Sequence, residues 1–150
     1  MQSNMKRLNN GDCFYGDITR KTIWDQTSWI DIMIRAYLEC ALWSSIDDKD
    51  EPFDTEHDID DFSDEAIKQA FEDCQEFAND FHDTILCLHQ QCKYDQSRAG
   101  HDLWLTRNGH GAGFWDRGLH ESGEKMTEKA QNMGSCDLYK GDDNKLYFAG

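Results

Sequence analysis

The chain has 150 residues, the size of one compact domain, with 38% hydrophobic residues and a formal net charge of −15. Eight Phe, five Trp and five Tyr provide large buried areas, so we expect the chain to fold around one core despite its charge. No apolar run approaches the roughly 20 residues of a membrane span, and residues 1–11 lack the apolar segment of a secretory signal. These features predict a soluble, cytoplasmic protein that neither enters membranes nor binds nucleic acid directly.

The first part of the chain predicts one central helix. Residues 12–23 have no clear periodicity, and we expect a loop or a short edge strand there. Residues 28–43 are apolar on nearly all sides, and Ser28 followed three residues later by Asp31 is typical of a helix start. We therefore expect a well-buried helix that begins at Ser28.

The cysteines are expected to be reduced. They form no CxxC pair, and three of them, Cys40, Cys74 and Cys87, fall within apolar helical patterns. We therefore expect most of them to be small buried hydrophobic residues. The six are Cys13, Cys40, Cys74, Cys87, Cys92 and Cys136.

Nearly all of the net charge arises between residues 47 and 83, which hold sixteen of the thirty acidic residues and two basic ones. Residues 47–61 contain the only proline and no helical stripe, so they predict an acidic loop that is either functional or disordered. Ser63 then predicts the start of a second helix, with Asp64 and Glu65 at the positive end of its dipole.

The second helix is expected to be amphipathic. Its apolar residues recur every three to four positions from Ile67 to Leu88, and its acids fall mainly on the opposite side. The pattern fades near residues 90–96, where we expect a linker. An acidic helical part, about 24–96, would thus precede a second part, about 100–150, within a single domain.

The second part predicts strands around one more helix. Residues 103–107 and 110–115 flank Asn108-Gly109, which favours a hairpin turn that would place Leu103 opposite Phe114 and Trp104 opposite Gly113. A third helix is expected from about Leu119 to Met133, ended by Gly134, followed by a hairpin of residues 136–140 and 145–148. The fold class is therefore α+β, with N-terminal helices packed on a small C-terminal antiparallel sheet.

The acidic tract predicts a partner with a basic surface. Seven acids between Asp64 and Asp83 span roughly 30 Å of helix, or about 4 Å per charge, close to the 3.4 Å per phosphate of one DNA strand. Such a surface would compete with DNA for a basic groove, whereas the alternative is a solvated face that only maintains solubility. The predicted partner-binding residues are Asp54, Glu56, Asp58, Asp60, Asp61, Asp64, Glu65, Glu72, Asp73, Glu76, Asp80 and Asp83.

Two other interpretations of this tract are weaker. Asp54, Glu56, Asp58 and Asp60 alternate like the first ligands of an EF-hand, but Ile59 stands where that loop needs glycine. A disordered acidic tail is disfavoured because an ordered helix carries about half of the charge.

Residues 100–118 suggest the main alternative function. Their sequence, GHDLWLTRNGHGAGFWDRG, places His101, Asp102, His110 and Asp116 close together in the chain, with Arg107 and Arg117 nearby. Histidine with carboxylate is a common element of zinc and acid-base sites, and the expected hairpin would bring His101 near Asp116. A small metal-dependent or acid-base enzyme is therefore the alternative to a purely structural role for this segment.

The same segment, with the flanking YLECALW and the terminal DLYKGDDNKLYF, resembles small proteins of bacteriophages and mobile elements that have no assigned function. This resemblance implies a phage-type origin and assigns a catalytic role to no residue. Small acidic phage proteins include anti-restriction proteins, anti-CRISPR proteins and uracil-glycosylase inhibitors, which resemble DNA in charge. By analogy, we expect a non-enzymatic inhibitor without a cofactor, which binds a host defence or DNA-processing protein in the host cytoplasm.

Overall fold

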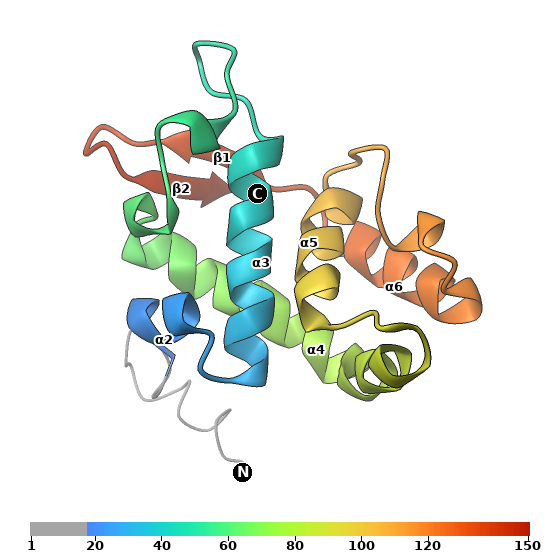
Figure 1. Ribbon diagram of the computed structural model, residues 1–150. Helices are drawn as coiled ribbons and strands as arrows, with labels where there is room; N and C mark the ends of the chain where they lie inside the picture. Colours follow the sequence, from blue (N-terminus) through green and yellow to red (C-terminus); the bar gives the residue numbers. More distant parts are fainter. Residues whose placement is uncertain (1–17) are drawn as a thin grey trace.

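The computed structural model describes residues 18–150, in which α helices dominate and one two-stranded antiparallel sheet follows them, as the expected α+β class requires. No helix in this part of the chain is both long and apolar enough to cross a membrane. The elements are α2 (Arg20–Asp25), α3 (Trp29–Ser44), η1 (Phe53–Thr55), η2 (Ile59–Asp61), α4 (Asp64–Cys92), α5 (Gln96–Arg107), η3 (Phe114–Asp116), α6 (His120–Asn132), β1 (Asp137–Lys140) and β2 (Leu146–Ala149). Figure 1 shows α3 at the centre, with α4 crossing it, α5 and α6 to one side, and the hairpin near the C-terminal end of α3.

Helix α3 is the centre of the core and begins where the sequence predicts. The Ser28 Oγ accepts the N–H of Asp31 at 3.3 Å, and the Asp31 carboxylate accepts the N–H of Ser28 at 3.2 Å, which completes a capping box. α3 packs most extensively against α5, where Gly100 lies directly against the carbonyl oxygen of Met33. A side chain at position 100 would therefore collide with the α3 backbone.

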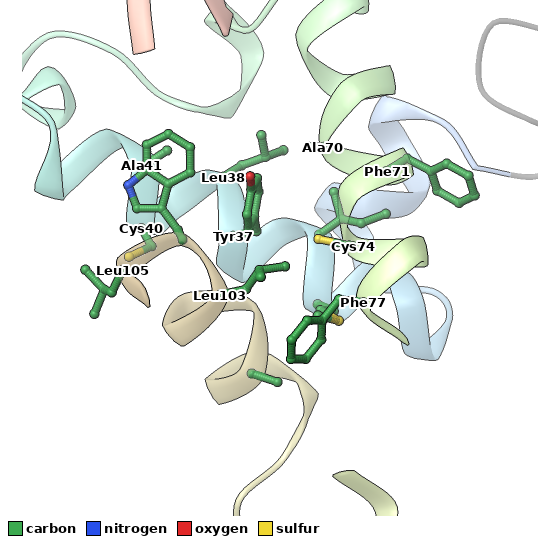
Figure 2. Packing of buried hydrophobic residues seen from close by; sticks show 14 of the residues in the cluster. Tyr37, Leu38, Cys40, Ala41, Ala70, Phe71, Cys74, Phe77, Leu103 and Leu105 are labelled. Carbon is green, nitrogen blue, oxygen red and sulfur yellow. The ribbon is translucent and has the colours of Figure 1, made fainter. Parts of the chain in front are cut away.

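Helix α4 also begins as predicted, because the Ser63 Oγ accepts the N–H of Ala66 at 3.0 Å. In Figure 2, Tyr37 from α3, Cys74 and Phe77 from α4 and Leu103 from α5 gather between the three helices. The predicted apolar face of α4 is buried except for Phe81, which is partly buried against the core. The buried residues of this face are Ile67, Phe71, Cys74, Phe77, Ala78, Ile85 and Leu88.

The predicted C-terminal elements are present. Helix α6 lies within the expected range, and Gly134 follows it with a φ of +83°, a conformation that glycine adopts without strain. Strands β1 and β2 pair antiparallel, with Leu138 opposite Phe148 and Tyr139 opposite Tyr147. The buried side chain of Leu146 attaches the hairpin to the core.

The predicted hairpin of residues 103–115 is wrong. Residues 103–107 belong to α5, which starts after Asp95, whose carboxylate accepts the N–H of Arg98 at 3.1 Å. The dipeptide Asn108-Gly109 ends this helix, with Gly109 at a φ of +67°, and residues 110–118 form a loop that contains η3. Leu103 and Trp104 therefore pair with no strand residue.

Three smaller predictions also need correction. Residues 20–25 form α2 rather than a loop or strand, because Thr19 and Thr22 complete a capping box; residues 12–17 lie outside the described part. The linker shrinks to residues 93–95, since α4 continues to Cys92. Cys87, which was expected to be buried, is exposed, and so is Cys92. Cys40, Cys74 and Cys136 are buried.

Candidate acidic interface

The acidic loop, residues 47–61, has a defined conformation. Phe53 and Ile59 are buried in the core at 4% and 1% exposure and anchor its two short helical turns. At its start, the Asp47 carboxylate accepts the N–H groups of Glu51 and Lys49 at 3.0 and 2.9 Å, and these bonds lower the pKa of Asp47. The remaining acids of the loop are thus presented from a folded segment.

Arg20 of α2 joins the end of this loop to the start of α4. Its guanidinium donates to the carbonyl oxygens of Ile59 and Phe62 at 3.0 and 2.8 Å. It also pairs with the exposed Asp64 carboxylate at 3.0 Å. One cation from a distant helix therefore fixes the loop and α4 as a continuous acidic surface.

Ten of the twelve predicted partner-binding residues are exposed. Asp61 is half-buried, and its carboxylate contacts His57 Nδ1 at 3.1 Å. Asp73 is also half-buried and differs most from its expected place on the open face of α4. The exposed residues are Asp54, Glu56, Asp58, Asp60, Asp64, Glu65, Glu72, Glu76, Asp80 and Asp83.

Asp73 belongs to an internal ion pair. Its carboxylate lies 2.8 Å from Arg107 Nη1, and the two side chains are only 13% and 7% exposed. Arg107 also donates to the hydroxyl of Tyr37 at 2.9 Å and to the carbonyl oxygens of Gly134 and Met133 at 2.7 and 3.1 Å. Burial raises the pKa of Asp73, and the charge of Arg107 opposes that rise. Asp73 therefore stabilises the junction of α3, α4 and α5.

The row of charge along α4 is also interrupted by a lysine. Lys129 of α6 lies 3.1 Å from Glu76 and 3.2 Å from Asp80 and bridges them. With Asp73 buried and these two acids paired, the middle of α4 does not carry the uniform charge of a DNA strand. The acids are most closely spaced in the loop, which holds nine of them in residues 47–61, and the first turn of α4 adds Asp64 and Glu65.

A hollow that the sequence did not indicate lies beside the far end of this surface. It has a volume of about 790 Å³ and is lined by Trp29 and His82, whose ring centroids are 4.4 Å apart. Asp80 and Asp83 also line it. Trp29 opens α3 and His82 lies on α4, so no local pattern signalled their approach.

The calcium interpretation finds no support in the geometry. Ile59, at the position where an EF-hand needs glycine, is a core residue. Within residues 18–150, no group of three or more His, Cys, Asp or Glu side chains is arranged to hold a metal ion. Two of the alternating acids instead have local partners: the Asp58 carboxylate accepts the N–H of Asp60 at 2.9 Å, and Glu56 pairs with Lys49 at 3.4 Å.

The predicted His/Asp cluster is centred on Asp102, which is 1% exposed. Its carboxylate accepts the Tyr94 hydroxyl at 2.6 Å and the Arg117 Nε and Nη2 at 3.1 and 2.8 Å, with His101 Nδ1 at 3.4 Å. Burial alone would raise the pKa of Asp102, but the hydrogen bonds from His101, Arg117 and Tyr94 outweigh it and lower the pKa. The His101 ring also stacks on Trp43, at 5.4 Å between centroids. Asp102 is thus an ionised, internally paired carboxylate.

Asp116 lies at the edge of this cluster, because Arg117 Nε contacts both Asp116 and Asp102. Asp116 accepts the N–H of Gly113 at 3.3 Å and lies 3.6 Å from Arg117 Nε. His110 is exposed, and no hydrogen bond or ion pair among residues 18–150 connects it to His101. The structure thus brings His101 and Asp102 together and links Asp116 to Asp102 through Arg117, but among the described residues it does not connect His110 to them.

No family model, curated protein or solved structure matches this chain.

Proposed function

We propose that the chain is a non-enzymatic binding protein of the phage inhibitor type. It presents the loop of residues 47–61 and the first turns of α4 to the basic, nucleic-acid-binding groove of a host defence or DNA-processing protein. The partner's lysine and arginine side chains bind these carboxylates in place of phosphates, so the protein competes with the nucleic acid.

The observation that carries this proposal is the anchoring of the acidic loop. Nine acids and one lysine lie in residues 47–61, and buried Phe53 and Ile59 hold this segment in one conformation. Like charges kept close together oppose folding, so their retention on a folded segment favours a binding role. A preformed surface also loses less conformational entropy when a partner binds.

The Asp102 cluster supports a structural role better than a catalytic one. The carboxylate of Asp102 is already engaged by Tyr94 and Arg117, and among the described residues no contact connects His110 to it. Replacing His101 by Ala is therefore expected to leave partner binding and inhibition unchanged.

Charge reversal in the loop and the first turn of α4 tests the proposal. The triple variant Asp54→Lys, Asp60→Lys and Glu65→Lys changes exposed residues that hold no ion pair in the described structure. Tagged protein is first used to capture the host partner, and the affinity of the purified pair is then measured at low and high salt. We expect the variant to lose at least tenfold in affinity at low salt, and the wild-type affinity to fall as salt rises.

A matched control separates a specific surface from overall charge. Reversal of Glu121, Glu124 and Glu128, all exposed on α6, alters the net charge by the same amount at a different place. This control should bind the partner nearly as well as the wild type. Equal losses in the two triple variants, or no loss in either, would contradict the proposed surface.

A further inference from the structure

Strand β1 has an open edge. The Gly141 N–H donates to the Lys145 carbonyl at 2.8 Å, and opposite residues in an antiparallel ladder alternate between bonded and non-bonded pairs. Tyr139 therefore bonds to β2, whereas Leu138 and Lys140 turn their N–H and C=O groups away from it. No strand among residues 18–150 pairs with this outer side of β1.

The opposite edge of the sheet, formed by β2, is covered by another part of the chain. Its hydrogen bonds agree with the alternation described for β1. By the same alternation, the backbone N–H and C=O groups of Leu146 in β2 point away from β1. Its carbonyl oxygen accepts the Ser63 N–H at 2.9 Å. Phe62 forms an isolated bridge with Leu146. The start of α4 thus protects β2, and only β1 presents unpaired backbone groups within the described sheet.

A groove runs between this open edge and the acidic loop. Its volume is about 460 Å³; one wall contains Leu138 and Lys140, and the other contains Asp47, Asp48 and Glu56. Two lysines also line it, Lys140 on the strand and Lys49, which pairs with Glu56 at 3.4 Å. The loop as a whole is nonetheless strongly acidic, with nine acids and one lysine. In Figure 1, η1 lies next to β1, and the turn of residues 46–52 projects beyond the sheet.

We infer that this groove binds an extended basic segment of the partner protein, which adds to β1 as a third antiparallel or parallel strand. Main-chain hydrogen bonds to Leu138 and Lys140 supply affinity, and alternate Lys or Arg side chains of the segment face the acids of the loop. This inference rests on the proposed function, because it specifies how part of a basic partner docks on the same acidic surface.

A basic peptide of defined backbone chemistry tests the strand addition. The probe is a capped octapeptide of alternating Arg and Thr, and its control is the same peptide with every second backbone nitrogen methylated. Methylation removes the N–H groups of one strand edge and leaves the charge unchanged. We expect the methylated peptide to bind at least tenfold more weakly, and the unmodified peptide to slow amide hydrogen exchange at Leu138 and Lys140 at least tenfold.

A protein variant provides an independent measurement. Lys140→Pro removes an outward N–H and leaves the β1–β2 hydrogen bonds intact, because proline is tolerated on an edge strand where its nitrogen faces outward. We expect this variant to keep the circular dichroism of the wild type and to lose at least fivefold in affinity for the unmodified peptide. If this variant does not fold, the comparison of the two peptides and the exchange rates of the wild-type protein still decide whether a strand adds to β1.

The possible results separate this inference from the proposed function. Equal binding of both peptides, or unchanged exchange at Leu138 and Lys140, overturns the strand addition. If reversal of Asp54, Asp60 and Glu65 still lowers the affinity for the host partner, the proposed acidic interface stands even when strand addition is overturned. If those reversals have no effect while the edge amides are protected, the proposed surface fails and the strand site remains.

Discussion

Replacing Arg107 by Met removes the cation that pairs with Asp73 in a largely buried network. Arg107 Nη1 lies 2.8 Å from the Asp73 carboxylate, and the two side chains are 7% and 13% exposed. Methionine keeps most of the volume and the flexible stem, so the change isolates the charge and its hydrogen bonds. The Tyr37 hydroxyl and the carbonyl oxygens of Gly134 and Met133 lose their donor as well.

The expected loss is large because the Asp73 carboxylate loses its cation and keeps the uncharged amide of Gln69, 3.1 Å away. Breaking a buried ion pair by removing one member costs about 3–5 kcal/mol in the free energy of unfolding. For a chain of this length that loss lowers the melting temperature by roughly 6–20 °C. The exposed pair of Lys125 and Glu121, 65% and 80% accessible, serves as the control. Lys125→Met should cost at most about 1 kcal/mol.

The loss in the free energy of unfolding caused by Arg107→Met should also depend on pH. Burial raises the folded-state pKa of Asp73 above its ordinary value of 3.8, so between the unfolded and folded pKa values the folded chain binds more protons. Stability therefore falls as pH rises through this window. Without Arg107 the folded pKa of Asp73 rises further and the window widens upward, so Arg107→Met should lose more stability at pH 7 than at pH 5.

Urea unfolding monitored by tryptophan fluorescence measures these differences, with equal slopes confirming comparable folded states. The variant Asp73→Asn and the double variant complete a cycle, in which the double variant should lose less than the sum of the single losses. A loss below about 1 kcal/mol for Arg107→Met at pH 7, or strictly additive losses, would refute the assignment of Asp73 to a stabilising internal pair.

Two further outcomes follow from packing and exposure. Gly100→Ala should destabilise the protein by about 1–3 kcal/mol in the same unfolding assay, because the new methyl group meets the Met33 carbonyl and this clash outweighs the better helix propensity of alanine; an unchanged or raised stability would contradict that contact. Brief alkylation under native conditions, followed by peptide mass analysis, should modify the exposed Cys87 and Cys92. It should not modify Cys40, Cys74 and Cys136, which are buried and whose thiols have raised pKa values. Rapid modification of Cys40, for which burial raises the pKa to about 12, would contradict its buried position.

Local signals in the sequence were sufficient for three helices and the C-terminal hairpin. The caps at Ser28 and Ser63 and the apolar spacing along residues 67–88 depend only on neighbours within a few positions, so they could be recognised without a fold. The hairpin at residues 103–115 failed for a related reason. Leu103, Trp104 and Leu105 are all buried, so α5 has no polar stripe to reveal helical periodicity. The same Asn-Gly pair that favours a hairpin turn also suits a helix end.

The candidate surface was only partly predictable. The positions of the acidic residues in the sequence located the charge between residues 47 and 83, and this requires no knowledge of the fold. Which acids remain open to a partner depended on cations far along the chain. Arg107 removes Asp73 from the surface, and Lys129 pairs with Glu76 and Asp80, and no local pattern records such pairs.

The sequence by itself therefore determined the starts of α3 and α4, the α+β class and the place of the acidic tract in the chain, because caps, periodicity and charge are local properties. Only the tertiary structure decided which of these acids remain open to a partner, because Arg107 pairs with Asp73 inside the protein and Lys129 pairs with Glu76 and Asp80. It also placed the open edge of β1 beside the acidic loop. Both results arise from contacts between residues distant in the chain, which form only when the helices and the hairpin pack together.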